Sequence, residues 1–218
     1  MPPAPARSSA DTRERILDAA EALFAVNGFD ATGLRMITGQ AGVNSAAVNY
    51  HFGGKEGLIR EVFRRRLQWL NAERLLRLDD LEAAAGGAPL TPTGIIEVFF
   101  GPALEMAADT ENGGHAFMHL LGRTYAEPAA FIRRFLAEGS APMLDRFRVA
   151  LIRALPDVPE EEIVWRLMFM LGAMSFSIAG TESLRMVTGF SGAPSDPAAL
   201  APRLLSFLLG GMRAPLPA

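Results

Sequence analysis

The sequence predicts an all-α protein built from a small N-terminal domain and a larger C-terminal one. No segment sustains the alternation of apolar and polar residues that marks a half-buried strand. Apolar residues instead recur at the spacing of a helix face along most of the chain. The segment from Ala83 to Pro92, AAAGGAPLTP, is the clearest linker. We therefore expect a disordered arm over 1–10, a small helical domain over 11–54, a connecting helix over 55–85 and a larger helical domain over 86–218.

Composition limits the classes of protein that the chain can represent. Half of the 218 residues are hydrophobic, which is ample for a core. The absence of cysteine excludes a disulfide scaffold, a thiolate nucleophile and a Cys-ligated metal site. Met1 to Ala10 lacks the apolar core of a secretory signal, and the apolar stretch Ile163 to Gly180 carries Arg166. We expect a cytoplasmic protein that has no membrane partner, with that stretch as a buried or interface helix.

Charge is distributed unevenly between the two ends. The net charge is −3, but Met1 to Arg66 holds nine basic and seven acidic residues, against twelve and seventeen in the remainder. The two parts therefore carry +2 and −5, which places any polyanionic partner at the N-terminal end. The consecutive arginines 64 to 66 point around a helix rather than along one face, so we expect them on a solvated face of the connecting helix.

Three short helices are predicted before residue 54. The first starts at Asp11 and stops at Asn27-Gly28, and the second has Thr32 as its N-cap and ends near Gly42. The third runs from Asn44 or Ser45 to about Phe52. Two short helices joined by a tight glycine turn, with another packed across them, form a helix-turn-helix that presents one helix to a DNA major groove.

The segment GFDATGLRMITGQAGVNSAAVNYHFGGKEGLI resembles the signature of the TetR family of repressors. The resemblance covers about residues 11 to 63 with every element in order. The variant AAVNYHF is similar to the subgroup that controls fatty-acid metabolism. The sequence departs from the family pattern at Gly33, where Ser or Thr is usual, and at Gly54, which replaces a common Ser cap.

The resemblance implies a set of DNA-contacting residues with distinct roles. Thr32, Arg35 and Lys55 should contact phosphates, because helix N-termini and cationic side chains favour anions. Small residues at the start of the third helix allow close approach to base edges, and Asn49 is the best candidate for a base-specific hydrogen bond. Taken singly, a residue such as Thr32 is more often a plain cap and one such as Tyr50 more often core packing; the complete motif reverses that preference. The predicted set is Thr32, Arg35, Asn44, Ser45, Ala46, Ala47, Asn49, Tyr50, His51 and Lys55.

The C-terminal part predicts a dimer interface and an apolar cavity. The apolar stretch Ile163 to Gly180 and the last helix form half of a four-helix bundle that a second subunit would complete, as in similar regulators. A surplus of Met and Phe in the preceding helices suits a deformable ligand cavity, although each residue alone is also typical of an ordinary core. The predicted ligand-binding residues are Phe99, Phe100, Phe117, Leu121, Arg123, Tyr125, Phe135, Trp165 and Phe169.

Catalytic and metal chemistry find little support in the sequence. His115 and His119 have metal-ligand spacing, but Ala116 stands where a zinc protease has its glutamate, and Glu111 is the only nearby third ligand. No nucleophile-elbow, phosphate-loop or dinucleotide fingerprint occurs. We expect neither an enzyme nor a cofactor or metal site.

The resemblance therefore predicts a homodimeric repressor of a palindromic double-stranded DNA operator. A small apolar effector would release it, and the subgroup implies a long-chain fatty acid or its CoA thioester. Three alternatives stay open. These are a DNA-binding protein that responds to no ligand, a regulator of another hydrophobic or aromatic compound, and a lipid-binding protein with a vestigial helix-turn-helix.

Overall fold

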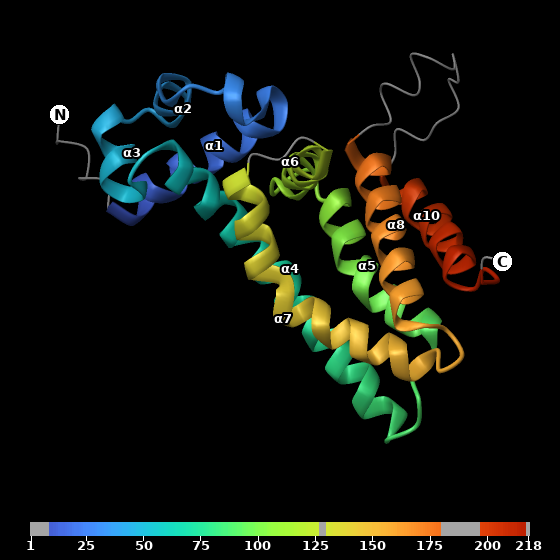
Figure 1. The fold of residues 1–218 in the computed structure, drawn as a ribbon. Coiled ribbons are helices and arrows are strands. Elements are labelled where there is room, and N and C mark those ends of the chain that lie inside the picture. The colour runs from blue at the N-terminus through green and yellow to red at the C-terminus, as the bar shows by residue number, and fades with distance from the viewer. Residues whose placement is uncertain (1–8, 127–129, 180–196, 217–218) are drawn as a thin grey trace, which may run out of the picture. The chain divides into compact units, whose positions relative to one another are not determined.

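The computed structural model describes residues 9–126, 130–179 and 197–216, all of whose regular elements are helices (Figure 1). The all-α class is thereby confirmed for the described residues, and the predicted arm lies outside them except for Ser9 and Ala10, which begin the first helix. None of the described helices has the length and apolar character that crossing a membrane requires.

The chain divides into two compact units, Met1–Arg66 and Leu67–Ala218. Three short helices and the start of a long one make up the first unit, and the rest of the long helix opens the second. The helices are α1 (Ser9–Ala31), α2 (Leu34–Ala41), α3 (Ser45–Phe52), α4 (Lys55–Ala85), α5 (Pro92–Ala108), α6 (Gly114–Ala126), α7 (Ala130–Ala154), α8 (Glu160–Ala179) and α10 (Pro197–Met212).

The first unit is held by one apolar core to which all four helices contribute. Gly28, with φ 80°, interrupts α1 at the predicted stop, although three further residues continue it to Ala31. The periodic apolar residues of each helix point inward and are fully buried. They are Ile16, Leu17, Ala20 and Phe24 of α1, Ile37 of α2, Val48 of α3 and Leu58, Ile59, Val62 and Phe63 of α4.

A buried carboxylate fastens α1 to α4 inside this unit. Glu21 is 3% exposed and accepts hydrogen bonds from Arg66 Nη2 at 2.6 Å and from Arg65 Nη2 at 2.8 Å. Arg65 also reaches Asp18 Oδ1 at 2.7 Å. The expectation of a solvated arginine face is therefore wrong for Arg65 and Arg66, whose guanidinium groups are needed to neutralise a charge removed from water.

Replacement of Glu21 by Gln should destabilise the first unit by about 2 to 3 kcal/mol. The substitution removes the buried charge that both arginines face, and the cost is below that of a fully buried pair because the arginines keep partial solvent contact. Asp18→Asn is the matched control, since Asp18 is exposed and its loss should cost less than about 1 kcal/mol. Urea unfolding measures both values, and equal costs for the two variants would contradict the role of Glu21.

The second unit packs α5 against α6, α7 and α10, and α6 against α8. Phe99 and Phe147 meet edge to face with ring centroids 4.9 Å apart. Pro102 lies inside α5 and lacks an N–H, so this turn loses one helical hydrogen bond. Arg74 of α4 is buried here, with its guanidinium 4.4 Å from the centre of the Phe99 ring and its Nε donating to the Phe99 carbonyl at 2.8 Å.

Helix α4 is held in this unit by an ion pair, and helix α7 by buried apolar side chains. Arg77 donates to both carboxylate oxygens of Glu105 at 2.7 Å, and these hydrogen bonds lower the pKa of Glu105. Helix α7 runs without interruption through Pro142. Met143 and Phe147 are buried beyond that proline, and their packing outweighs the one missing bond.

Candidate nucleic-acid interface

Helix α3 is short and is defined by its two ends. The Asn44 side chain caps it by accepting a hydrogen bond from the Ala46 N–H at 3.0 Å. Gly53, with φ 70°, ends it. The turn before it depends on Gly42, with φ 61°, whose position also faces the Arg15 side chain. Arg15 donates to the carbonyls of Ala41 and Gly42 and so satisfies the C-terminus of α2.

The two sides of α3 differ sharply in exposure. Val48 and Phe52, one turn apart, are buried and hold the helix on the core. Tyr50 is 83% exposed, which rules out the alternative that it serves as core packing. Helical spacing places the exposed residues on one continuous face, with Ala47 and His51 half-buried at its margin. The exposed face consists of Ser45, Ala46, Asn49 and Tyr50, and the Asn44 cap lies exposed at its start.

The predicted phosphate contacts fare differently. Arg35 is exposed in the first turn of α2, as a phosphate ligand must be. Thr32 is fully buried, and its hydroxyl donates to the Gly28 carbonyl at 2.7 Å and lies 3.2 Å from that of Leu23. The N-cap of α2 is Gly33, which offers no side-chain bond. The assignments of Thr32 as N-cap and as phosphate ligand are therefore wrong, because its hydroxyl is used to close the end of α1.

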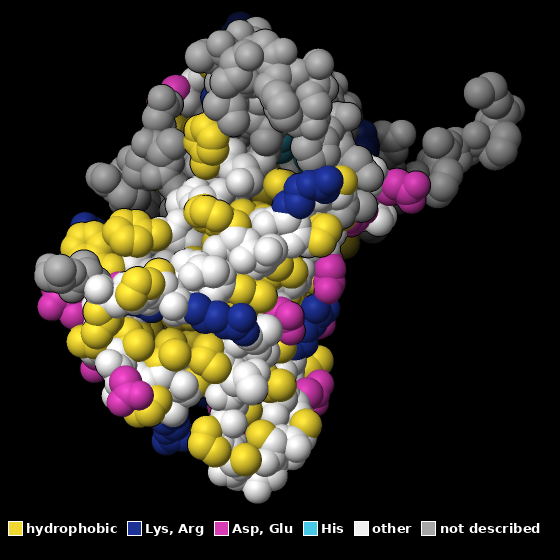
Figure 2. Space-filling model, turned by 90° about the vertical axis from the view of Figure 1, so that its right-hand side faces the viewer, with side chains coloured by type: hydrophobic (Ala, Val, Ile, Leu, Met, Phe, Trp, Pro, Cys, Tyr) yellow, Lys and Arg dark blue, Asp and Glu magenta, His cyan; other side chains and the backbone are white. Residues whose placement is uncertain are grey.

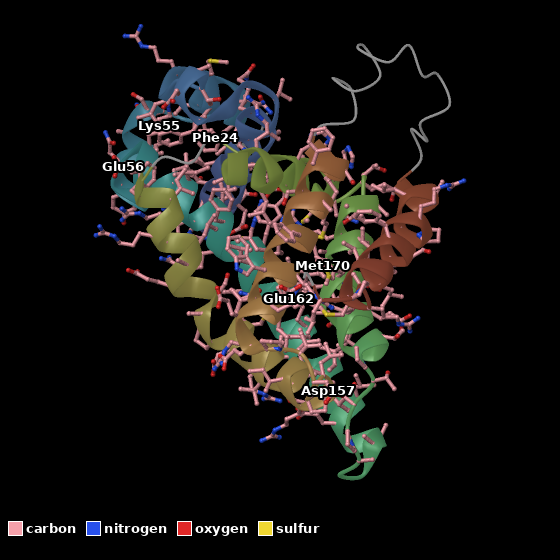
Figure 3. The ribbon with its side chains drawn as sticks, turned by 45° about the vertical axis from the view of Figure 1, so that its right-hand side comes forward. Phe24, Lys55, Glu56, Asp157, Glu162 and Met170 are labelled. Carbon is pink, nitrogen blue, oxygen red and sulfur yellow. The ribbon has the colours of Figure 1, made fainter. Side chains whose placement is uncertain are left out.

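Lys55 begins α4 in contact with the end of α1. Its Nζ lies 4.3 Å from the centre of the Phe29 ring and donates to the Asp30 carbonyl at 3.3 Å. Figure 3 labels Lys55 and Glu56 at this start of α4, and Phe24 of the core. Lys55 as a whole is half-buried, and these contacts orient its ammonium group as a point charge at the edge of the unit.

Sequence reasoning missed Gly57, which sets the angle between α3 and α4. A Cβ at this position would overlap the carbonyl oxygen of Phe52, the last residue of α3. Only glycine allows α4 to start so close to the C-terminus of α3. The only sequence signal was the glycine in the KEGL segment. The requirement for glycine there comes from the close approach of two backbone segments, which the spacing of apolar residues does not reveal.

Gly57→Ala should destabilise the first unit by about 1 to 3 kcal/mol, because an added methyl against backbone atoms forces the two helices apart. Gly39→Ala is the control. Its Cβ would enter open space in α2, and alanine favours a helix by roughly 0.5 to 1 kcal/mol over glycine. Denaturant melts of the two variants should shift in opposite directions, and a neutral Gly57→Ala would refute the close approach.

Two family models match the chain. One, described as "Tetracyclin repressor-like, C-terminal domain", matches residues 97–211, more than half of the chain. The other, "Bacterial regulatory proteins, tetR family", matches residues 16–62 and so includes α3. The chain belongs to the TetR family. The matched N-terminal model is described as one of bacterial regulatory proteins, and it covers the helix-turn-helix of this chain.

Curated relatives match this TetR-family chain only in part. The repressor KstR2 of Mycolicibacterium smegmatis is 37% identical over 70 residues, which are 32% of this chain and 34% of that protein. The regulator BetI of Vibrio vulnificus is 36% identical over 58 residues, 27% and 29% of the two chains. The chain matches about a third of the length of these relatives, so the alignments carry no information about the compounds to which those proteins respond.

Solved structures extend the similarity of fold to most of the chain. FadR from Bacillus subtilis in complex with stearoyl-CoA has a TM-score of 0.65 at 17% identity, covering 91% of this chain and 98% of that one. KstR2 of Mycobacterium tuberculosis has a TM-score of 0.55 at 20% identity, covering 91% and 93%. At such identities the likeness establishes the fold alone.

The predicted ligand residues separate into two groups in the second unit. Phe99, Phe100, Phe117 and Leu121 are buried together in the core, and Phe135 is half-buried. Arg123 is exposed, and the side chain of Tyr125 is outside the described residues.

Trp165 and Phe169, also predicted as ligand residues, are 46% and 66% exposed, so their assignment to an internal cavity is wrong. Helix α8 turns Ile163, Met170 and Met174 toward the core instead, which leaves Trp165 and Phe169 on the opposite side. Figure 3 labels Glu162 and Met170 on this helix.

Arg166 and His115 of the second unit have structural partners. Arg166 is 6% exposed and donates to Glu162 at 2.8 Å and to the Met212 carbonyl at 2.7 Å, so it closes the end of α10. His115 Nδ1 lies 2.9 Å from the Ala107 carbonyl, and the His115 and His119 ring centres are 4.9 Å apart. The described residues contain no cluster of three metal-binding side chains.

Proposed function

We propose that this TetR-family protein is a homodimeric repressor that binds a palindromic DNA operator through α3 and is released by a small apolar effector. The observation that carries the proposal is the free face of α3, an exposed surface of small and hydrogen-bonding side chains on a helix anchored from behind by Val48 and Phe52. Such a face fits a major groove, which is wide enough to admit a helix.

Each exposed residue has a defined task in this proposal. Ser45 and Ala46 are small and let the backbone approach the base edges, while Asn49 presents an amide that pairs with the N6 and N7 groups of adenine. Tyr50, His51 and Lys55 serve the phosphate backbone, as does Arg35 at the start of α2. The first unit carries a charge of only +2, so affinity must come from two copies on half-sites about one DNA turn apart, ~34 to 36 Å.

Asn49→Ala should weaken operator binding at least about tenfold and relax the preference at one base pair of each half-site, because a bidentate amide contact is lost. The variant should unfold like the wild type, since Asn49 is exposed. Gln68→Ala, an exposed amide in the second unit, is the control and should bind unchanged. Fluorescence anisotropy on an operator selected from random duplexes measures the affinities. Undiminished binding by Asn49→Ala would remove Asn49 from the interface.

The exposed side of α8 supports the homodimer. Val164, Trp165, Met168, Phe169 and Phe176 all lie exposed along it, and Phe207 of α10 is 68% exposed. Figure 2 shows hydrophobic side chains gathered on one face of the molecule. Large apolar patches of this kind mark protein interfaces. A two-fold dimer would bury the patch of each copy against the same patch of its partner, in agreement with the four-helix bundle predicted from the sequence.

Phe169→Glu should raise the dimer dissociation constant at least about tenfold. Because the dimer is two-fold symmetric, the substitution places one buried charge in the interface from each subunit. Leu76→Glu is matched in chemistry, since Leu76 is 55% exposed on α4 away from α8 and α10. Sedimentation velocity over a dilution series should find the Leu76 variant dimeric like the wild type. Two variants with identical profiles would place the interface elsewhere.

The interior of the second unit supports an apolar effector. Phe99, Phe100 and Phe117 are buried in the same two helices as Met106 and Met118, and methionine side chains adapt readily to a changed neighbour. Helix α4 is continuous from Lys55 to Ala85, so in this proposal displacement of its later half by a ligand is transmitted through the helix backbone to the start that adjoins α3. The solved complex of the structurally similar FadR with stearoyl-CoA supports a long-chain acyl compound as the effector. The structurally similar KstR2, described as a ketosteroid regulator, supports a ketosteroid as the alternative effector.

Palmitoyl-CoA or oleate should lower operator affinity about 5- to 150-fold, the range of ordinary allosteric coupling. The measurement is anisotropy of labelled operator during ligand titration, with free coenzyme A as the control that lacks the acyl chain. Release by a ketosteroid but by neither acyl compound would select the alternative of another hydrophobic effector. Release by none of them would identify a DNA-binding protein that responds to no such ligand.

A further inference from the structure

A pocket of about 630 Å³ lies at the end of the second unit where α4 gives way to α5. Its walls come from the last turns of α4, from the connection over 87–90 and from one face of α7. Figure 1 shows this connection and the C-terminal half of α7 at the same end of the unit. None of its lining residues belongs to the predicted ligand set, and its size lies within the range of small-molecule sites.

The lining combines an apolar floor with two arginines. Pro89, Leu90 and Val149 supply apolar surface, and Arg146 and Arg153 project from α7 seven residues apart, on the same face of the helix. Arg146 donates from Nη2 to Asp79 Oδ1 at 2.8 Å and to Glu82 Oε2 at 3.0 Å, which orients its guanidinium. Arg153 is exposed, and no carboxylate of the described residues pairs with it.

The wall formed by the connection is ordered by its own backbone. Gly86 N–H donates to the Ala83 carbonyl at 3.2 Å and Ala88 N–H to the Ala85 carbonyl at 3.0 Å. These bonds close the C-terminus of α4 and set the segment that carries Pro89 and Leu90 in place. A ligand would therefore enter a pocket whose shape exists beforehand and would lose little affinity to ordering the chain.

We propose that this pocket binds a small organic monocarboxylate with an apolar body. The carboxylate would pair with Arg153, whose planar fork matches it, while the body lies on Pro89, Leu90 and Val149. The negative charge of Glu82 in the lining disfavours a dianion. The apolar lining residues disfavour an ion without a hydrocarbon part, because such an ion would lose hydration without gaining apolar contact. The site would be a second ligand site, separate from the core in which the proposed effector binds.

The test is calorimetric titration of the full chain with octanoate, octanamide and inorganic phosphate. Octanoate should bind, octanamide should bind at least about tenfold more weakly because it lacks the charge, and phosphate should give no heat. Arg153→Gln should weaken octanoate at least about tenfold, and Val149→Trp should abolish its binding by filling the pocket. Arg203→Gln, an exposed arginine of α10, should leave binding unchanged.

Three results would overturn the proposal. One is no binding of octanoate at about 1 mM, the weak end of the affinity scale. Another is equal affinity of the wild type and Arg153→Gln, which would place octanoate elsewhere, including the core. The third is equal affinity for the acid and its amide. Arg153 is exposed, so its substitution does not endanger folding and decides the matter even where Val149→Trp fails to fold.

Discussion

An eight-residue helix is not stable by itself in water, and α3 exists only because two of its side chains are buried. Val48 and Phe52 occupy one side of the helix, and everything exposed on the other side owes its direction to them. The rest of the first unit serves this attachment. Gly57 lets α4 begin against the end of α3, and Glu21 with Arg65 and Arg66 holds α4 to α1.

The sequence was most informative where local chemistry decides the structure. The helix-turn-helix and the turn at Gly42 both follow from residue types at fixed spacing. Thr32 was misjudged because a threonine before a helix fits both a cap and a bond back to the preceding helix, and only the chain path through Gly28 decides between them. Arg15 and Gly57 were missed because their partners lie across helix boundaries, where periodicity carries no information.

Helix α8 illustrates a different limit. It is apolar nearly all round, so its sequence predicts burial of the whole helix without saying which side meets its own chain and which a partner. The structure turns Met170 and Met174 inward and leaves Trp165 and Phe169 outside. The two residues predicted to line a cavity thereby move to the proposed dimer surface, and the apolar interior that remains for an effector lies around Phe99, Phe100 and Phe117.

The central claim is that the exposed face of α3 enters a major groove in two copies. Methylation protection on a selected operator tests it directly, because the reagent reads guanine N7 in the major groove and adenine N3 in the minor groove. The account predicts protection of guanine N7 in two patches about one helical turn apart, ~10 base pairs, related by a palindrome. Protection confined to adenine N3, or a single protected patch, would contradict it.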